Sequence, residues 1–124
     1  MNVIRRFVSV VDDDDSVRES LPDLLREFGF EVQAFSSAEE FLASDSVSRT
    51  SCLILDVAMP GMSGPELQRE LMCHMHRIPI VFITAHADEA VRLRALGHGA
   101  VQCLIKPFSE TALLEALNVA LSDP

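Results

Sequence analysis

The chain has 124 residues, 48% of them hydrophobic and 23% charged, which is typical of one globular domain with its own core. Ten Lys and Arg against nineteen Asp and Glu give a formal net charge of −9, which argues against direct binding of a nucleic-acid backbone by these residues. The three cysteines, Cys52, Cys73 and Cys103, form no CxxC pair and favour a reducing, cytoplasmic location over a disulfide framework. No apolar run approaches the roughly 20 residues of a membrane span, so we expect no membrane insertion.

Five short apolar runs alternate with longer amphipathic stretches, which predicts β-α units and a parallel sheet. The second run alternates apolar and polar residues and is expected at a sheet edge, whereas the others are nearly continuous and are expected to be covered on both faces. The predicted strands are Phe7 to Val11, Phe30 to Phe35, Ser51 to Val57, Ile80 to Thr84 and Ala100 to Ile105.

Apolar residues at helical spacing predict five helices between and after these strands. The first helix contains the stripe Val17, Leu21, Leu24, Leu25 and Phe28, and the last contains Leu113, Ala116, Leu117, Ala120 and Leu121. Shorter helices are predicted at Ala38 to Ala43, Pro65 to Met75 and Asp88 to Leu96. Pro22 lies inside the first helix, and we expect a bend there because proline removes one backbone hydrogen bond. The pattern predicts an α/β fold with a doubly wound, five-stranded parallel sheet.

Polar side chains follow several strands at their carboxyl ends, where doubly wound sheets bind ligands. The first strand is followed by Asp12 to Asp15, the third ends near Asp56, the fourth in Thr84, and the fifth is followed by Lys106. In a flavodoxin-like strand order of 2-1-3-4-5, taken by analogy, these groups share one edge of the sheet. Clustered carboxylates repel one another by about 4 kcal/mol per pair at 4 Å and an effective dielectric of 20, so they favour a bound cation. Oxygen ligands favour Mg²⁺ over zinc or copper.

A carboxylate beside a divalent cation, with a lysine and a hydroxyl nearby, has the groups needed to accept a phosphoryl group as an aspartyl phosphate. Asp56 is the predicted nucleophile. Lys106 would pair with one phosphoryl oxygen, and Thr84 would donate a hydrogen bond to another.

Four segments in order resemble the receiver domain of two-component response regulators, most closely the FixJ type, with a CheY-like fold. The segments are residues 11–18, 55–64, 83–86 and 99–108, and the resemblance covers nearly all of residues 1–124. It implies that a sensor histidine kinase phosphorylates Asp56, and that Asp12, Asp13 and the backbone carbonyl of Ala58 serve the metal together with Asp56. In this family the peptide bond corresponding to Lys106–Pro107 is cis.

The resemblance also implies a phosphorylation-controlled switch rather than an enzyme, although receivers assist their own phosphorylation and dephosphorylation. When Thr84 moves toward the phosphoryl group, the surface of the fourth helix and fifth strand would change and support a phosphorylation-dependent homodimer. In this sequence that surface is predicted to include Val91, Arg94, Ala95, Gln102 and Leu104. We expect the output to be transcription, through a DNA-binding effector domain that follows Pro124 in a longer protein.

Cys103 departs from the family pattern, because receivers usually carry Tyr or Phe at this position. The usual aromatic switch cannot operate, which leaves open a degenerate receiver that acts only as a docking module. A Mg²⁺-dependent phosphatase of the haloacid-dehalogenase type is a weaker alternative, because it needs a second Asp where this chain has Ala58. A flavodoxin is weaker still, since no Ser/Thr-rich phosphate loop follows the first strand. His74 and His76 do not share a helix face and are expected to be solvated.

Overall fold

Five β-α units build the fold, and the computed structural model describes residues 6–86 and 88–122. All strand pairings are parallel, and the strand order is β2-β1-β3-β4-β5, so the predicted fold class and order are confirmed. In chain order the elements are β1 (Phe7–Val11), α1 (Asp15–Glu27), β2 (Glu31–Phe35), α2 (Ala38–Ala43), β3 (Cys52–Asp56), α3 (Gly64–Cys73), β4 (Ile80–Thr84), α4 (Glu89–Gly97), β5 (Gln102–Ile105) and α5 (Glu110–Leu121).

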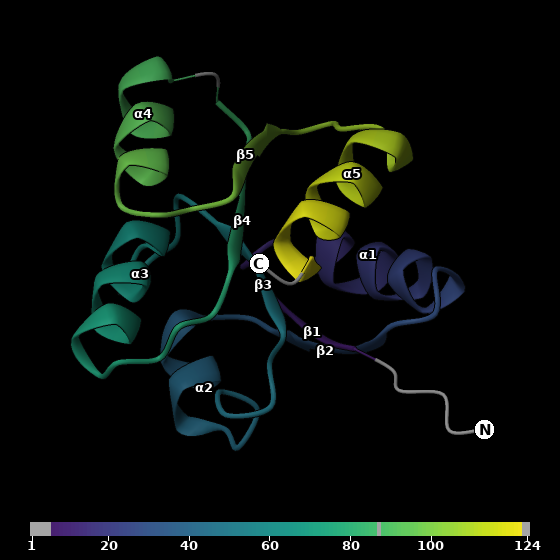
Figure 1. Cartoon of the computed structure of the whole chain (residues 1–124), viewed down its shortest axis with the longest axis horizontal. Helices are drawn as coiled ribbons and strands as arrows, with labels where there is room; N and C mark the ends of the chain where they lie inside the picture. The colour runs from purple at the N-terminus through teal and green to yellow at the C-terminus, as the bar shows by residue number, and fades with distance from the viewer. Residues whose placement is uncertain (1–5, 87, 123–124) are drawn as a thin grey trace.

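Helices cover both faces of the sheet (Figure 1), with α2, α3 and α4 on one side and α1 and α5 on the other. Side chains of one strand alternate between the two layers. In β3, Leu53 and Leu55 pack in the core on the α2–α4 side, while Ile54 packs in the core on the α1–α5 side. Every residue of β1, β3 and β4 is buried, as their continuous apolar sequences predict.

The two edge strands differ from the central ones. In β2, exposed Glu31 and Gln33 flank buried Val32, although Phe35 is buried as well, and the strand order confirms the predicted edge position. The expectation that β5 is covered on both faces is wrong: β5 is the other edge strand, and Ile105 is 46% exposed. Three strands are also shorter than predicted, because Phe30, Ser51, Val57 and residues 100–101 lie outside the paired segments. Apolar sequence continues past these strands, so it does not mark their ends.

Local side-chain signals set where the helices begin. The Asp14 side chain accepts a hydrogen bond from the Ser16 amide and caps α1, while Ser63 and Glu66 form a capping box at the start of α3. Helix α1 continues through the buried Pro22, and the bend that we expect there stays a prediction. Within residues 6–86 and 88–122, no helix combines the length and apolar character that crossing a membrane requires.

Candidate functional site

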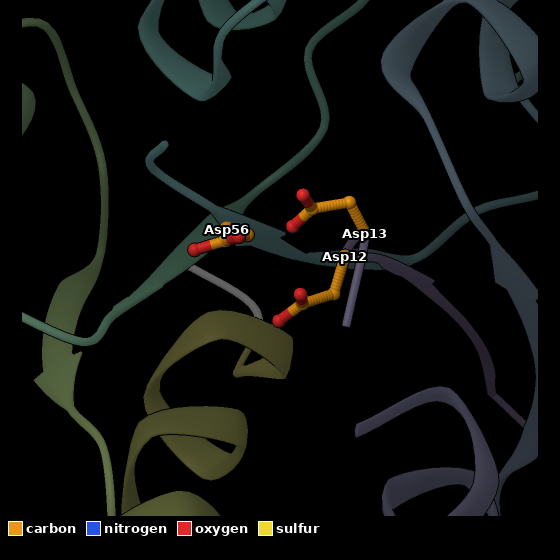
Figure 2. A group of neighbouring side chains, drawn as sticks. All are labelled: Asp12, Asp13 and Asp56. Atoms are coloured by element: carbon orange, nitrogen blue, oxygen red, sulfur yellow. The ribbon is translucent and has the colours of Figure 1, made fainter. Parts of the chain in front are cut away.

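Three carboxylates lie together at the carboxyl ends of two neighbouring strands (Figure 2). Asp12 and Asp13 directly follow β1, and Asp56 is the last residue of β3. Each offers a carboxylate oxygen, and these oxygens lie within 4.8 Å of one another. Asp12 and Asp56 are buried whereas Asp13 is exposed, so the cluster is open to solvent on one side. The strand order thus brings together residues that are more than 40 positions apart in sequence.

Lys106 supplies the cation that the structure places against this cluster. Its Nζ lies 2.8 Å from Oδ2 of Asp12 and 3.8 Å from Oδ1 of Asp56. Burial of the Lys106 ammonium by itself lowers its pKa, but the hydrogen bond to Asp12 and the charges of Asp12 and Asp56 outweigh burial and raise the pKa. The Lys106–Pro107 peptide bond is cis, as the resemblance implies.

Asp56 is held in a site that disfavours its charge. Burial, followed by the neighbouring charge of Asp12, raises the Asp56 pKa from 3.8 to about 7, and Asp13 adds to the rise. Lys106 opposes this shift but does not cancel it. One lysine among three carboxylates leaves the cluster short of positive charge, and the all-oxygen donor set suits a hard divalent cation such as Mg²⁺.

Ala58 and Thr84 were predicted to serve the metal ion and the phosphoryl group, respectively. Ala58 lies two residues beyond Asp56, just past the carboxyl end of β3. The Thr84 hydroxyl is buried at the end of β4, where it donates to the His86 carbonyl at 3.2 Å and accepts from the His86 amide at 3.2 Å. The hydroxyl is therefore engaged with its own loop rather than with Asp56.

Cys103 pairs with Phe82 of β4, two residues before Thr84, and lines the same small cavity as Thr84. Its side chain is buried on the α4 side of β5. A cavity of about 80 Å³ adjoins it, lined by Thr84, His86, Val91, Arg92 and other residues of this corner.

One residue of the predicted switch surface is placed wrongly. Ala95 is only 3% exposed and belongs to the core beneath α4, because the helix turns this position toward the sheet. Val91 and Arg94 are accessible, as predicted. Gln102 and Leu104 line a hollow against α5, so they lie on the opposite side of β5 from Cys103. His74 is exposed and bonds Glu70 on its own helix, in agreement with a solvated side chain.

Sequence reasoning missed two residues that shape the site. Arg18 donates from its guanidinium to the Asp12 carbonyl at 2.9 Å and so braces the acidic turn. Gly64 lies so close to the Asp56 carbonyl oxygen that an added Cβ would stand 2.3 Å from it. Arg18 carries no local signal that it contacts Asp12. Gly64 does carry a signal in the sequence: it lies in the first turn of a helix, where glycine is normally unfavourable, so a close contact is needed to explain it.

Residues 8–118 match the family model of the response regulator receiver domain. The chain belongs to the response regulator receiver domain family. It is 48% identical over 116 residues to Nodulation protein W of Bradyrhizobium diazoefficiens, a match that covers 94% of this chain and 51% of that protein. The chain spans about half the length of the curated relatives that it matches first.

Solved structures agree with this family. The response regulator StyR superposes with a TM-score of 0.87 at 51% identity, covering 95% of this receiver domain and 60% of that chain. FixJ-N superposes with a TM-score of 0.85 at 38% identity, covering 96% of this receiver domain and 95% of that chain. The receiver domain is therefore a phosphorelay component of the two-component type, and such domains act as switches rather than as enzymes.

Proposed function

We propose that Asp56 accepts a phosphoryl group from the phosphohistidine of a sensor histidine kinase, with Mg²⁺ held by Asp12, Asp13, Asp56 and the Ala58 carbonyl. The observation that carries the proposal is the cluster of three carboxylates within 4.8 Å, with Lys106 Nζ 3.8 Å from Asp56. A bound divalent cation supplies the positive charge that the incoming phosphoryl oxygens need.

The residues of this chain have separate parts in the transfer. The Asp56 carboxylate attacks phosphorus, the P–N bond to the kinase imidazole breaks, and a P–O bond to Asp56 forms. Lys106 neutralises one of the phosphoryl oxygens while keeping its contact with Asp12. Thr84 leaves His86 and donates its hydroxyl hydrogen to a second phosphoryl oxygen. Water at the open, Asp13 side later hydrolyses the aspartyl phosphate.

The output of the switch is proposed to be the α4–β5 surface. Thr84 and Cys103 line one small cavity together with Val91 and Arg92 of α4, so a movement of Thr84 would change the packing against α4. We propose that phosphorylation changes this surface to favour a homodimer. In the longer protein, residues 1–124 would be the receiver domain that controls transcription through an effector domain after Pro124, which lies outside the described residues.

The test is intact mass spectrometry after incubation with Mg²⁺ and acetyl phosphate. A phosphoryl-sized mass gain that Asp56→Asn abolishes supports the proposal, and removal of Mg²⁺ with a chelator should prevent the gain. Asp45→Asn, an exposed carboxylate on the loop after α2, is the matched control and should be phosphorylated like the original chain. No gain with acetyl phosphate or with a phosphorylated kinase domain would instead favour a docking module.

A further inference from the structure

Two adjacent hollows lie beside α3, one between α3 and α4 and the other between the end of α3 and the loops that precede β4 and β5. One, of about 380 Å³, lies beside Val57 and Ala58, and the other, of about 580 Å³, lies beside Pro79 and Gly99. Both are lined by Gln68 and His98, and the buried Gln68 side chain donates to the Ala95 and His98 carbonyls at 3.4 Å, so the two hollows adjoin at this contact; together we call them the α3–α4 groove. On α3 the lining residues run from Pro65 to Met72, a length of about 10 Å at 1.5 Å per residue, and Met75 extends the groove beyond the end of the helix.

The α3–α4 groove is basic although the chain as a whole is acidic. Neither hollow has an aspartate or glutamate among its lining residues, in a chain with nineteen of them and a net charge of −9. The smaller cavity at Thr84, by contrast, is lined by Asp88 and Glu89. The cationic and titratable residues that line the groove are Arg69, Arg77, Arg94, His76 and His98.

The arginines of the groove are available to a partner. Arg18, Arg26 and Arg92 each pair with a carboxylate on their own helix. Across the described part of the chain, Arg69 and Arg94 make no ion pair. Both side chains belong to exposed residues on neighbouring helices, so a ligand can reach them without unfolding.

Apolar side chains complete the floor and rim of the groove. Met72 is 55% exposed and Met75 is 78% exposed, and both line the larger hollow together with Leu71, Ile78 and Val101. Met75 has φ 61°, a left-handed conformation uncommon outside glycine, and its exposed side chain lies at the rim. Methionine adapts its shape to a bound surface better than branched side chains do. At the other end, Val91 and Pro65 line the smaller hollow.

We propose that the α3–α4 groove binds an acidic amphipathic helix of a partner protein. Carboxylates on one side of such a helix would meet Arg69 and Arg94, and its apolar face would cover Met72 and the floor of the larger hollow. Two or three helical turns match the length of the groove. The groove does not include Asp56, but its smaller hollow borders the proposed metal site at Val57 and Ala58, so the binding experiments are carried out without Mg²⁺ and without a phosphodonor.

The test uses three synthetic helical peptides of about 15 residues, with Leu at i, i+4 and i+7 and with either Glu, Gln or Lys at the flanking positions. Titration into ¹⁵N-labelled protein, followed by NMR, gives both the Kd and the residues that respond. We expect the Glu peptide to bind about tenfold more tightly than the Gln peptide and to shift signals along α3 and α4. The Lys peptide should bind most weakly.

A double variant, Arg69→Ala with Arg94→Ala, should weaken the Glu peptide about tenfold. The matched control, Arg6→Ala with Arg26→Ala, removes the same charge elsewhere and should leave the Kd within about twofold. Asp56→Asn should bind normally, which separates this result from the phosphorylation assay. Equal binding of the Glu and Lys peptides, or an equal loss of affinity in both double variants, would overturn the proposal. Signal shifts confined to β5 and α5 would also overturn it, as would self-association through the groove in sedimentation.

Discussion

Replacing Asp56 with asparagine should stabilise the metal-free protein near and above neutral pH, although it removes the proposed phosphoacceptor. The Asp56 side chain is only 8% exposed, and its neighbours Asp12 and Asp13 are also acidic. Asparagine keeps nearly the same shape and removes the charge. The gain in stability is therefore expected from electrostatics, without new packing.

The pKa of Asp56 sets the sign and the upper limit of this effect. The unfolded chain releases the Asp56 proton near its ordinary pKa of 3.8, whereas the folded chain holds it up to about 7. Between these values the folded state binds more protons, so the free energy of unfolding falls as the pH rises, and this loss is complete above the folded pKa. The shift corresponds to at most about 4 kcal/mol. Asp56→Asn avoids this loss and should be more stable by about 1 to 4 kcal/mol at pH 8.

Urea unfolding with a chelator present, followed by circular dichroism at about pH 4 and pH 8, measures the difference. The two proteins should have similar stability at the lower pH and separate at the higher one. Asp45→Asn, with its exposed carboxylate, should follow the original chain at both. A variant that is no more stable than the original at pH 8, or a difference that does not change with pH, would refute the reasoning.

Magnesium should reverse the same destabilisation in the original chain. A cation that binds only the folded state stabilises it by RT ln(1 + [L]/Kd), about 1.4 kcal/mol at ten times the Kd. Asp56→Asn loses one ligand and the charge that attracts the cation, so its stability should respond less at the same Mg²⁺ concentration. Equal responses of the two proteins would place the cation elsewhere.

Three further substitutions test other parts of the molecule. Gly64→Ala places a Cβ 2.3 Å from the Asp56 carbonyl oxygen, so the free energy of unfolding in urea should fall by about 1 to 3 kcal/mol. Phosphorylation by acetyl phosphate should also be slower, and an unchanged rate would contradict the close approach. Cys103→Phe fills the cavity of about 80 Å³ at Thr84 and should change phosphorylation-linked dimerisation, measured by sedimentation, more than the phosphorylation rate; equal effects on both, or on neither, would count against it. Phe41→Ala removes a fully buried ring and its edge contact with Phe35, and should lower the free energy of unfolding by about 3 to 5 kcal/mol; a loss below about 1 kcal/mol would mean that the core refills.

The sheet and its carboxyl edge could be predicted because they depend on short, local patterns. The apolar runs of β1, β3 and β4 identify strands buried on both faces, and the acidic residues that follow β1 and end β3 then fall at one edge. The strand order itself came from analogy. With that order assumed, the proximity of Asp12 to Asp56 follows from the pairing of β1 with β3.

Features that depend on how helices pack could not be predicted in the same way. Ala95 was expected on the surface, but the rotation of α4 about its axis turns it into the core, and α4 has no strong apolar stripe to indicate that rotation. Sequence gives no sign that Arg69 and Arg94, on different helices, line one groove. The bond between Thr84 and His86 likewise depends on a side-chain rotamer that sequence does not specify.

The engagement of Thr84 with His86 limits how far phosphorylation can shift the equilibrium between the two states. In the proposed switch, Thr84 would give up two hydrogen bonds of 3.2 Å to His86 as it turns toward a phosphoryl oxygen. The charge-assisted bond that it would gain is worth about 1.5 to 3 kcal/mol, and losing its two present bonds would cost about 1 to 3 kcal/mol. Thr84 would then contribute a net preference of at most about 2 kcal/mol, whereas a change from 1:99 to 99:1 needs about 5.5 kcal/mol. Phosphorylation would then shift only part of the population of a single domain to the second state, and a nearly complete shift would require several domains to act together.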